Sequence, residues 1–200
     1  DADPRPTKRG GAYSTGIPGT RPFIFVSYGD DLASASTLVH ELGHSLHSAL
    51  TNDAQPWDTS DYPSFLAEVA SNLGQALMRG YLLAQPLDRE LELSLLHEAL
   101  VNLYRYLFQM PHLAQLEVTL HERAWAGDPI TATTICDACR GAFERGFGGR
   151  VEAPDDDLAL VWIGFPHLFQ PFYTFQYTSG IAAAHALARP LLAGEPGARE

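Results

Sequence analysis

The chain has 200 residues, of which 46% are hydrophobic and 18% are charged, a balance typical of a globular domain that buries its own core. Its formal net charge is −11, and only 13 Lys and Arg side chains are spread along it, which argues against a nucleic-acid partner. Apolar runs stay short of the ~20 residues that span a bilayer, so we also expect no membrane anchor.

The first 29 residues predict an irregular segment with a small β element. Residues 22–28 are apolar and β-branched between turn residues, and residues 12–14 could pair with them as an antiparallel strand across the loop 16–20. The sequence starts at Asp1 without Met or an apolar signal core. We therefore expect it to be part of a longer polypeptide or a processed form.

From residue 30 to residue 193 the spacing of apolar residues becomes helical. We expect the first helix to place a stripe of Val39, Leu42 and Leu46 toward the core and to end near residue 52. Further helices are expected at about 61–84 with Asp61 as cap, at 88–126 with a break near Pro111, and at 131–146. These patterns predict a mainly α fold with a small antiparallel β element, in one domain over residues 1–200.

His40, Glu41 and His44 form an HExxH sequence inside the first predicted helix. Residues four apart lie one above the other on a helix, so both imidazoles can point at a single ion. Glu41 projects at a neighbouring angle, where it can act as general base on a water held by that ion. His47 lies on the same stripe, and we expect it to support the ligands or to pack beside them. A chance match is the alternative, and it is rare even before a helix is required.

Glu68 is the candidate for a third metal ligand, because a catalytic zinc usually has three protein ligands and one open position. It is the only charged residue between Leu66 and Leu77, and a lone carboxylate in an apolar helix is expected to be paired or coordinated. The second helix, packed antiparallel on the first, could bring Glu68 to the same ion. The alternative is a surface carboxylate.

Four sequence blocks resemble the oligoendopeptidase F branch of the M3, thimet oligopeptidase-like, metallopeptidases. They are RPTKRGGAYS at 5–14, HELGHSLH at 40–47, FLAEVAS at 65–71 and PHLFQPFYTFQYTSG at 166–180. The resemblance implies a helical, zincin-like fold with one Zn²⁺ held by His40, His44 and Glu68, and hydrolysis of short peptides. It also implies that an N-terminal region of the same polypeptide, outside these residues, forms the other wall of the substrate channel.

The resemblance gives roles to three residues of the last block. His167 and Tyr177 are implied as donors to the substrate and the transition state, and Tyr173 as a further substrate contact. The alternative is an aromatic core, in which a lone histidine satisfies a buried hydrogen bond. In either case a zinc site would let Glu41 take the proton of the attacking water and pass it to the leaving amine.

The sequence departs from the family pattern at four positions. Phe169, Gln170 and Phe175 stand where hydroxyl groups are expected, which affects substrate preference. Gln75 stands seven residues after Glu68, where the family usually has a second glutamate. Its amide can still hydrogen-bond a ligand histidine, but it raises the ligand's basicity less than a carboxylate would.

Cys136 and Cys139 form a CxxC motif, which we interpret as incidental thiols, because no second cysteine pair accompanies it. So few cysteines favour a reducing compartment, and we expect the cytoplasm. The sequence predicts a zinc endopeptidase acting on short peptides. The alternative is a non-catalytic zinc-binding or structural remnant that lacks its N-terminal channel wall.

Overall fold

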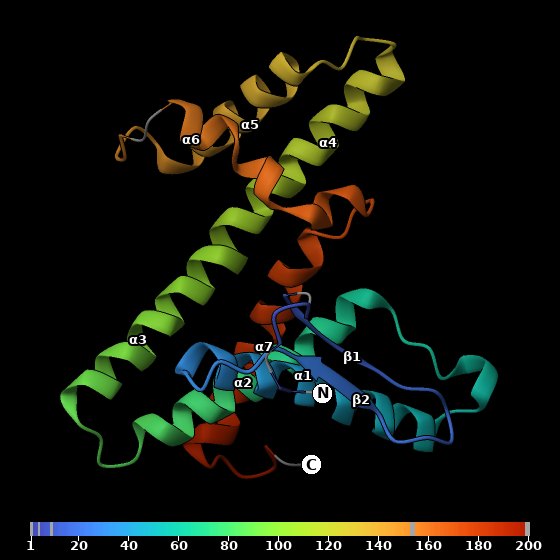
Figure 1. The fold of residues 1–200 in the computed structure, drawn as a ribbon, viewed down its shortest axis with the longest axis vertical. Coiled ribbons are helices and arrows are strands. Elements are labelled where there is room, and N and C mark those ends of the chain that lie inside the picture. The colour runs from blue at the N-terminus through green and yellow to red at the C-terminus, as the bar shows by residue number, and fades with distance from the viewer. Residues whose placement is uncertain (1, 4, 9, 153–154, 199–200) are drawn as a thin grey trace. The chain divides into compact units, whose positions relative to one another are not determined.

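The computed structural model describes residues 2–3, 5–8, 10–152 and 155–198. The chain divides into two compact units, one formed by residues 1–100 together with 179–200 and the other by residues 101–178. Helices make up most of both units, and one small antiparallel sheet accompanies them in the described residues (Figure 1). The predicted fold class is therefore confirmed.

The β element of the first unit is a hairpin of β1 (Ala12–Thr15) and β2 (Phe23–Val26). Tyr13 pairs with Phe25 across the two strands, and their rings stack with centroids 5.1 Å apart. Such cross-strand aromatic pairs fix the register of a short hairpin. Ser14 then hydrogen-bonds Ser45 at 2.8 Å, which joins the hairpin to the first helix.

The first helix, α1 (Leu32–Ala54), begins where Asp31 accepts a hydrogen bond from the Ser34 amide at 2.7 Å. The second, α2 (Ser64–Leu83), follows Pro63 at the N-cap position, and within the described residues it has no side-chain cap. The prediction that Asp61 caps this helix is wrong. The residue before a proline is disfavoured in the helical region, so Tyr62 cannot be the first helical residue and the helix starts after Pro63.

Helices α1 and α2 pack antiparallel, as expected, but α1 presents a different face from the predicted one. Its His40 and His44 side turns toward α2. Leu42 and Leu46 instead are 49% and 61% exposed, so the prediction that they face the core is wrong. Gly43 on this side of α1 lets the two helices approach closely, which a leucine there would prevent.

The third helical stretch is regular at both ends and widened in the middle. Helix α3 (Arg89–Leu103) continues into a π-helical turn at Tyr104–Gln109 and then into α4 (Met110–Ala126). The Met110 amide bonds the Arg105 carbonyl, five residues back. The break expected near Pro111 is thus present as a π turn just before it, because a proline lacks the N–H for a regular bond and its ring crowds the preceding turn.

The second unit packs α4 against α5 (Ala132–Phe147), which starts at a capping box formed by Thr131 and Thr134. A short helix, α6 (Asp155–Ala159), and two 3₁₀ turns at Val161–Gly164 and Pro166–Phe169 lead to α7 (Phe175–Ala193). The core between α4 and α5 consists of fully buried side chains: Met110, Leu113, Leu116, Cys139 and Phe143. In the described part of the chain, no helix combines the length and the apolarity that a membrane crossing requires.

Candidate metal centre

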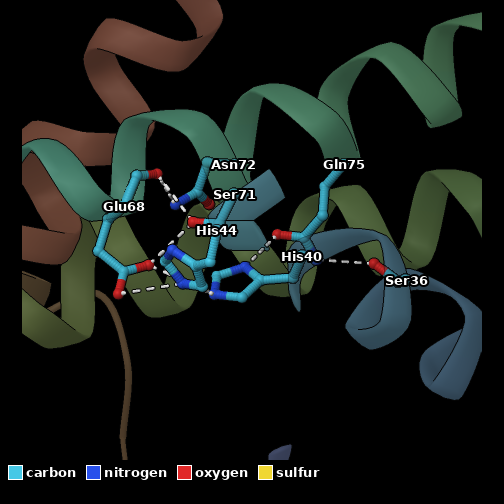
Figure 2. Close-up of polar contacts among 7 residues, drawn as sticks. All are labelled: Ser36, His40, His44, Glu68, Ser71, Asn72 and Gln75. Atoms are coloured by element: carbon cyan, nitrogen blue, oxygen red, sulfur yellow. Dashed lines mark hydrogen bonds and ion pairs between the residues drawn. The ribbon is translucent and has the colours of Figure 1, made fainter. Parts of the chain in front are cut away.

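Three potential ligands from α1 and α2 converge in the first unit. His40 and His44 come from successive turns of α1 and Glu68 from the facing side of α2, as Figure 2 shows. The two Nε2 atoms lie 3.2 Å apart, His40 Nε2 lies 3.4 Å from Glu68 Oε2, and His44 Nε2 lies 3.9 Å from Glu68 Oε1. In the described residues these ligand atoms form a group that could hold a metal ion, all within 4.8 Å of one another.

The spacing of these atoms fits a tetrahedral zinc ion. Two ligand atoms that each lie about 2.1 Å from such an ion are about 3.4 Å apart. The three measured separations, 3.2, 3.4 and 3.9 Å, lie around that value. Two imidazole nitrogens that face each other at 3.2 Å also need a proton or a cation between them, because their lone pairs otherwise repel. The donor set, two imidazoles and one carboxylate, is one that zinc prefers.

Two glycines allow the close helix packing that gathers the ligands. A Cβ placed on Gly43, between the two histidines, would come within 2.6 Å of both the Ala70 carbonyl oxygen and Ser71 Cα of α2. A Cβ on Gly180 of α7 would come within 2.5 Å of Glu68 Cβ. Helix backbones therefore touch at both points, which leaves Glu68 little freedom to move away from the histidines.

Hydrogen bonds from its own helix hold Glu68, which is only 4% exposed. The Ser71 hydroxyl donates to Glu68 Oε2 at 3.1 Å, and the Asn72 amide donates to the Glu68 carbonyl at 2.6 Å. Burial raises the pKa of this carboxyl group, but the hydrogen bond from His40 and the charges of both histidines outweigh burial and hold the pKa below its ordinary value. The carboxylate is thus ready to bind a cation.

The two histidines differ in their affinity for protons. Burial lowers the pKa of His40, yet the hydrogen bond and charge of Glu68 outweigh it, and the net pKa lies above the ordinary value. For His44 burial is the stronger effect, so its pKa lies below the ordinary value. In the metal-free site His40 therefore binds a proton more readily than His44 does.

Glu41 lies on α1 beside this cluster and is 6% exposed. Burial raises the pKa of its carboxyl group; the charge of Glu68 raises it further, while that of His40 opposes the increase. A carboxylate with a raised pKa is a better proton acceptor near neutral pH than an exposed one. Its burial and raised pKa therefore leave Glu41 able to accept a proton near neutral pH.

Gln75 and His47 occupy different surroundings. Gln75 Oε1 lies 3.0 Å from His40 Nδ1, so the amide contacts the ring nitrogen on the side opposite Nε2 (Figure 2). His47 stacks on Tyr62 with ring centroids 4.0 Å apart. Tyr62 also hydrogen-bonds Ser48 at 2.9 Å, which ties the loop before α2 to α1.

His167, Tyr173 and Tyr177 gather within the second unit. The His167 ring lies 5.5 Å from Tyr173 and 5.8 Å from Tyr177, and the two tyrosine rings are 5.5 Å apart. Tyr177 also stacks on Tyr106 at 5.4 Å. The structure thus brings the three expected substrate residues together as one aromatic cluster. Their unit is the one formed by residues 101–178, whereas the ligands belong to the other unit.

The remaining residues singled out in the sequence lie in the second unit as well. Phe169 is 74% exposed and Phe175 47% exposed, and Gln170 is exposed beside them. Cys139 is fully buried, and burial raises the pKa of its thiol, which keeps it protonated. Cys136 and Cys139 are both free. A protonated, buried thiol has the properties of a packing group.

The sequence did not predict the residues that pack against the potential ligands or hydrogen-bond to them. Gly43 and Gly180 give no ligand signal, and only their position among small residues hints at close helix packing. Arg79 was also missed, although it is the other charged residue of α2 and the argument used for Glu68 applies to it equally. Ser36 and Glu98 were missed because their roles depend on contacts far apart in the chain.

Two imidazoles and a carboxylate converge beside a buried glutamate, in a group that could hold a metal ion. The model of peptidase family M3 matches residues 1–198, and the chain therefore belongs to that family. It is 35% identical over 185 residues to oligopeptidase PepF from Bacillus subtilis, and 34% identical over 187 residues to an oligoendopeptidase F homolog from Lactococcus lactis. Among solved structures, oligoendopeptidase-F from Enterococcus faecium is similar, with a TM-score of 0.65 and 30% sequence identity over 84% of this chain.

The matched chain is much shorter than these relatives. The match covers 92% of it but 28% of PepF, 94% of it but 31% of the Lactococcus protein, and 30% of the Enterococcus chain. The 200 residues thus span about a third or less of each relative.

Proposed function

We propose that this chain is the catalytic part of a zinc-dependent endopeptidase that hydrolyses short peptides. The observation that carries the proposal is the convergence of His40, His44 and Glu68 at distances that suit one Zn²⁺, with Glu41 buried next to them. Membership of peptidase family M3 and the oligopeptidase names of its relatives support a peptidase reaction. The proposed catalytic domain extends over residues 1–200, and its proposed partners are peptide substrates and an N-terminal region of the same polypeptide.

The proposed roles follow from the chemistry of each side chain. Zinc at this site would polarise the peptide carbonyl and make a water molecule more acidic. Glu41 accepts the proton of the attacking water and then gives it to the leaving amine, which its raised pKa favours. Glu68, His40 and His44 stay deprotonated on the atoms that face the ion.

The aromatic cluster of the second unit supplies the proposed substrate contacts. His167 and Tyr177 carry polar hydrogens that can stabilise the oxyanion of the transition state, and Tyr173 can hydrogen-bond the peptide backbone. Phe169, Gln170 and Phe175 would make the neighbouring surface poorer in hydroxyl groups, and so shift the preference for peptide side chains. A cytoplasmic location is also proposed, since both cysteines are free thiols.

The test is zinc content together with hydrolysis of a short internally quenched peptide. The wild-type chain should hold one zinc and cleave the peptide, and a chelator should abolish cleavage. Glu41→Gln should keep the zinc and lose the activity, because the amide retains the shape but cannot accept a proton. Glu122→Gln, the same change at an exposed position of α4, is the matched control and should leave both properties unchanged.

The second candidate function is a zinc-binding or structural remnant that no longer cleaves peptides. It is favoured by one observation, the contact of His40 Nδ1 with the Gln75 amide, which raises the basicity of the imidazole less than a carboxylate would. Full zinc occupancy without any hydrolysis that depends on Glu41 would favour the remnant. Absence of zinc from the wild-type chain would overturn the peptidase and favour a structural remnant.

A further inference from the structure

The ring nitrogen of His40 that points away from the other ligands begins a chain of buried hydrogen bonds. His40 Nδ1 lies 3.0 Å from Gln75 Oε1 (Figure 2). Gln75 Nε2 donates to Ser36 Oγ at 2.8 Å, and the Ser36 hydroxyl donates to Glu98 Oε1 at 2.8 Å. Ser36 and Gln75 are only 3% and 7% exposed, so water does not compete strongly for these bonds.

The chain of bonds ends at a buried ion pair. Glu98 Oε2 accepts two hydrogen bonds from Arg79, at 2.6 Å from Nη2 and 2.8 Å from Nε. The Arg79 and Glu98 side chains are 10% and 16% exposed. A guanidinium that donates two hydrogen bonds to one carboxylate fixes that carboxylate in place. The series of hydrogen bonds from His40 through Gln75 and Ser36 to Glu98, here called the relay, therefore ends at a carboxylate on α3.

Glu98 determines the direction of every donor in the relay. Since its carboxylate accepts only, Ser36 must donate to it, and the free lone pairs of Ser36 then face Gln75. Gln75 must turn its NH₂ group to Ser36 and its carbonyl oxygen to His40. The reversed amide would require Ser36 to donate to Gln75, which would leave the Glu98 oxygen facing another lone pair. His40 Nδ1 is therefore the protonated nitrogen, and Nε2 keeps its lone pair for the ion.

We propose that Glu98, acting through Ser36 and Gln75, is a positioning residue that fixes the tautomer and orientation of His40. Metal-binding histidines commonly donate their second N–H to a carboxylate, which orients the ring and raises its basicity. In this chain an amide makes the direct contact, and the carboxylate acts from two residues away. The effect of the relay on zinc binding rests on the proposed function. The direction of its hydrogen bonds does not depend on the metal.

The first test is zinc affinity of the 200-residue chain, measured by competition with a chromophoric chelator. Glu98→Gln and Ser36→Ala should each weaken zinc binding by roughly 10- to 100-fold, the range found for groups that support metal ligands. Glu92→Gln is the matched control, since Glu92 also lies on α3 and pairs with an arginine, Arg89, but on the exposed surface. This control should bind zinc as the wild type does.

A rescue variant separates positioning from general structural support. Gln75→Glu, introduced into Glu98→Gln, places a carboxylate directly on His40 Nδ1 and should restore most of the lost zinc affinity. A role of Glu98 in stability alone predicts that the melting temperature of the metal-free chain falls and that Gln75→Glu does not restore zinc binding. That result, or unchanged affinity in both Glu98→Gln and Ser36→Ala, would overturn the proposal.

The proton on His40 gives a readout that does not depend on zinc or activity. In ¹⁵N-labelled protein the Nδ1–H resonance of His40 should be shifted downfield by its hydrogen bond, and Ser36→Ala should move it upfield. If the wild type binds no zinc and this shift is still observed, the proposed function fails and the relay stands. If zinc binds and Glu41→Gln abolishes cleavage, but the resonance is unaffected by Ser36→Ala, the function stands and the relay fails.

Discussion

Gly43 of α1 touches the backbone of α2 at Ser71, so closely that a Cβ on Gly43 would lie 2.6 Å from Ser71 Cα. Gly43→Ala must therefore push the two helices apart, because neither backbone atom can rotate away. We expect a loss of about 1–3 kcal/mol in the free energy of unfolding, as for other overpacked contacts. Zinc affinity should fall with it, since α1 carries both histidines and α2 carries Glu68.

The matched control for Gly43→Ala is Gly141→Ala on α5. A Cβ on Gly141 meets only the end of the flexible Arg145 side chain, at 3.2 Å. This substitution should stabilise the chain by up to about 1 kcal/mol, because alanine favours a helix more than glycine. Urea unfolding measures the free energy of unfolding of both variants. Equal changes in that free energy at the two positions would contradict a close contact at Gly43.

Glu68→Ala should remove the zinc from the purified chain. The substitution deletes a ligand and leaves two histidines on one helix, too few for a closed catalytic site. Elemental analysis at matched protein concentration should find about one zinc per wild-type chain and far less in the variant. Unchanged zinc in Glu68→Ala would mean that another residue is the third ligand.

Zinc affinity should increase with pH across the neutral range. The His40 pKa lies above its ordinary value of 6.5, so at pH 6.5 most of His40 is protonated and zinc must displace that proton. Each displaced proton changes the affinity by about tenfold per pH unit until the pH exceeds the folded-state pKa. Chelator competition at pH 6, 7 and 8 measures this slope. A flat profile would mean that His40 is already neutral at pH 6.

The same shifts set a pH range for the metal-free fold. A raised His40 pKa contributes stability below pH 6.5, which is lost as the pH rises through the folded-state pKa. A lowered Glu68 pKa contributes stability above pH 4.5, which is lost as the pH falls through its folded-state pKa. The pair should therefore stabilise the metal-free chain most between these two values. The melting temperatures of wild type and Glu68→Gln should therefore differ more between pH 4.5 and pH 6.5 than at lower or higher pH.

Tyr177→Phe should reduce peptide hydrolysis without changing zinc content. Loss of one transition-state donor typically lowers kcat by roughly 100- to 1,000-fold. The ring stack with Tyr106 does not need the hydroxyl group, so the fold should be preserved. Tyr81→Phe, at a tyrosine that is 65% exposed, is the control and should retain full activity. Equal kcat values for Tyr177→Phe and wild type would assign Tyr177 to packing alone.

The residue pattern was sufficient to predict the fold class, the hairpin and the convergence of His40, His44 and Glu68. Helical periodicity located α1, and the lone charge in an apolar stretch pointed to Glu68 because an isolated buried carboxylate is costly. The same periodicity placed Val39 correctly toward α2 but Leu42 and Leu46 wrongly. Periodicity measures where apolar residues recur, whereas the closest approach of α1 to α2 is at Gly43, which has no side chain.

The hydrogen-bond relay could not be predicted from sequence, because its members lie on three helices. Ser36 and Glu98 are 62 residues apart, and Ser36 and Gln75 are 39 apart. Local propensity and spacing carry no information about such pairs. The Asp61 cap failed for a local reason that could have been foreseen: Pro63 disfavours the helical conformation at Tyr62, the residue that would follow the cap.

Leu42, Leu46 and Leu50 form a ridge along the side of α1 that does not face α2, with 49%, 61% and 59% of each residue exposed. An exposed apolar ridge makes a protein self-associate and precipitate at high concentration. On this helix, however, the ridge lies on a different side from His40 and His44, which face α2. Polar substitutions such as Leu46→Lys should therefore improve colloidal behaviour while leaving the chemistry intact, which makes the chain suitable for the spectroscopy and titrations described above.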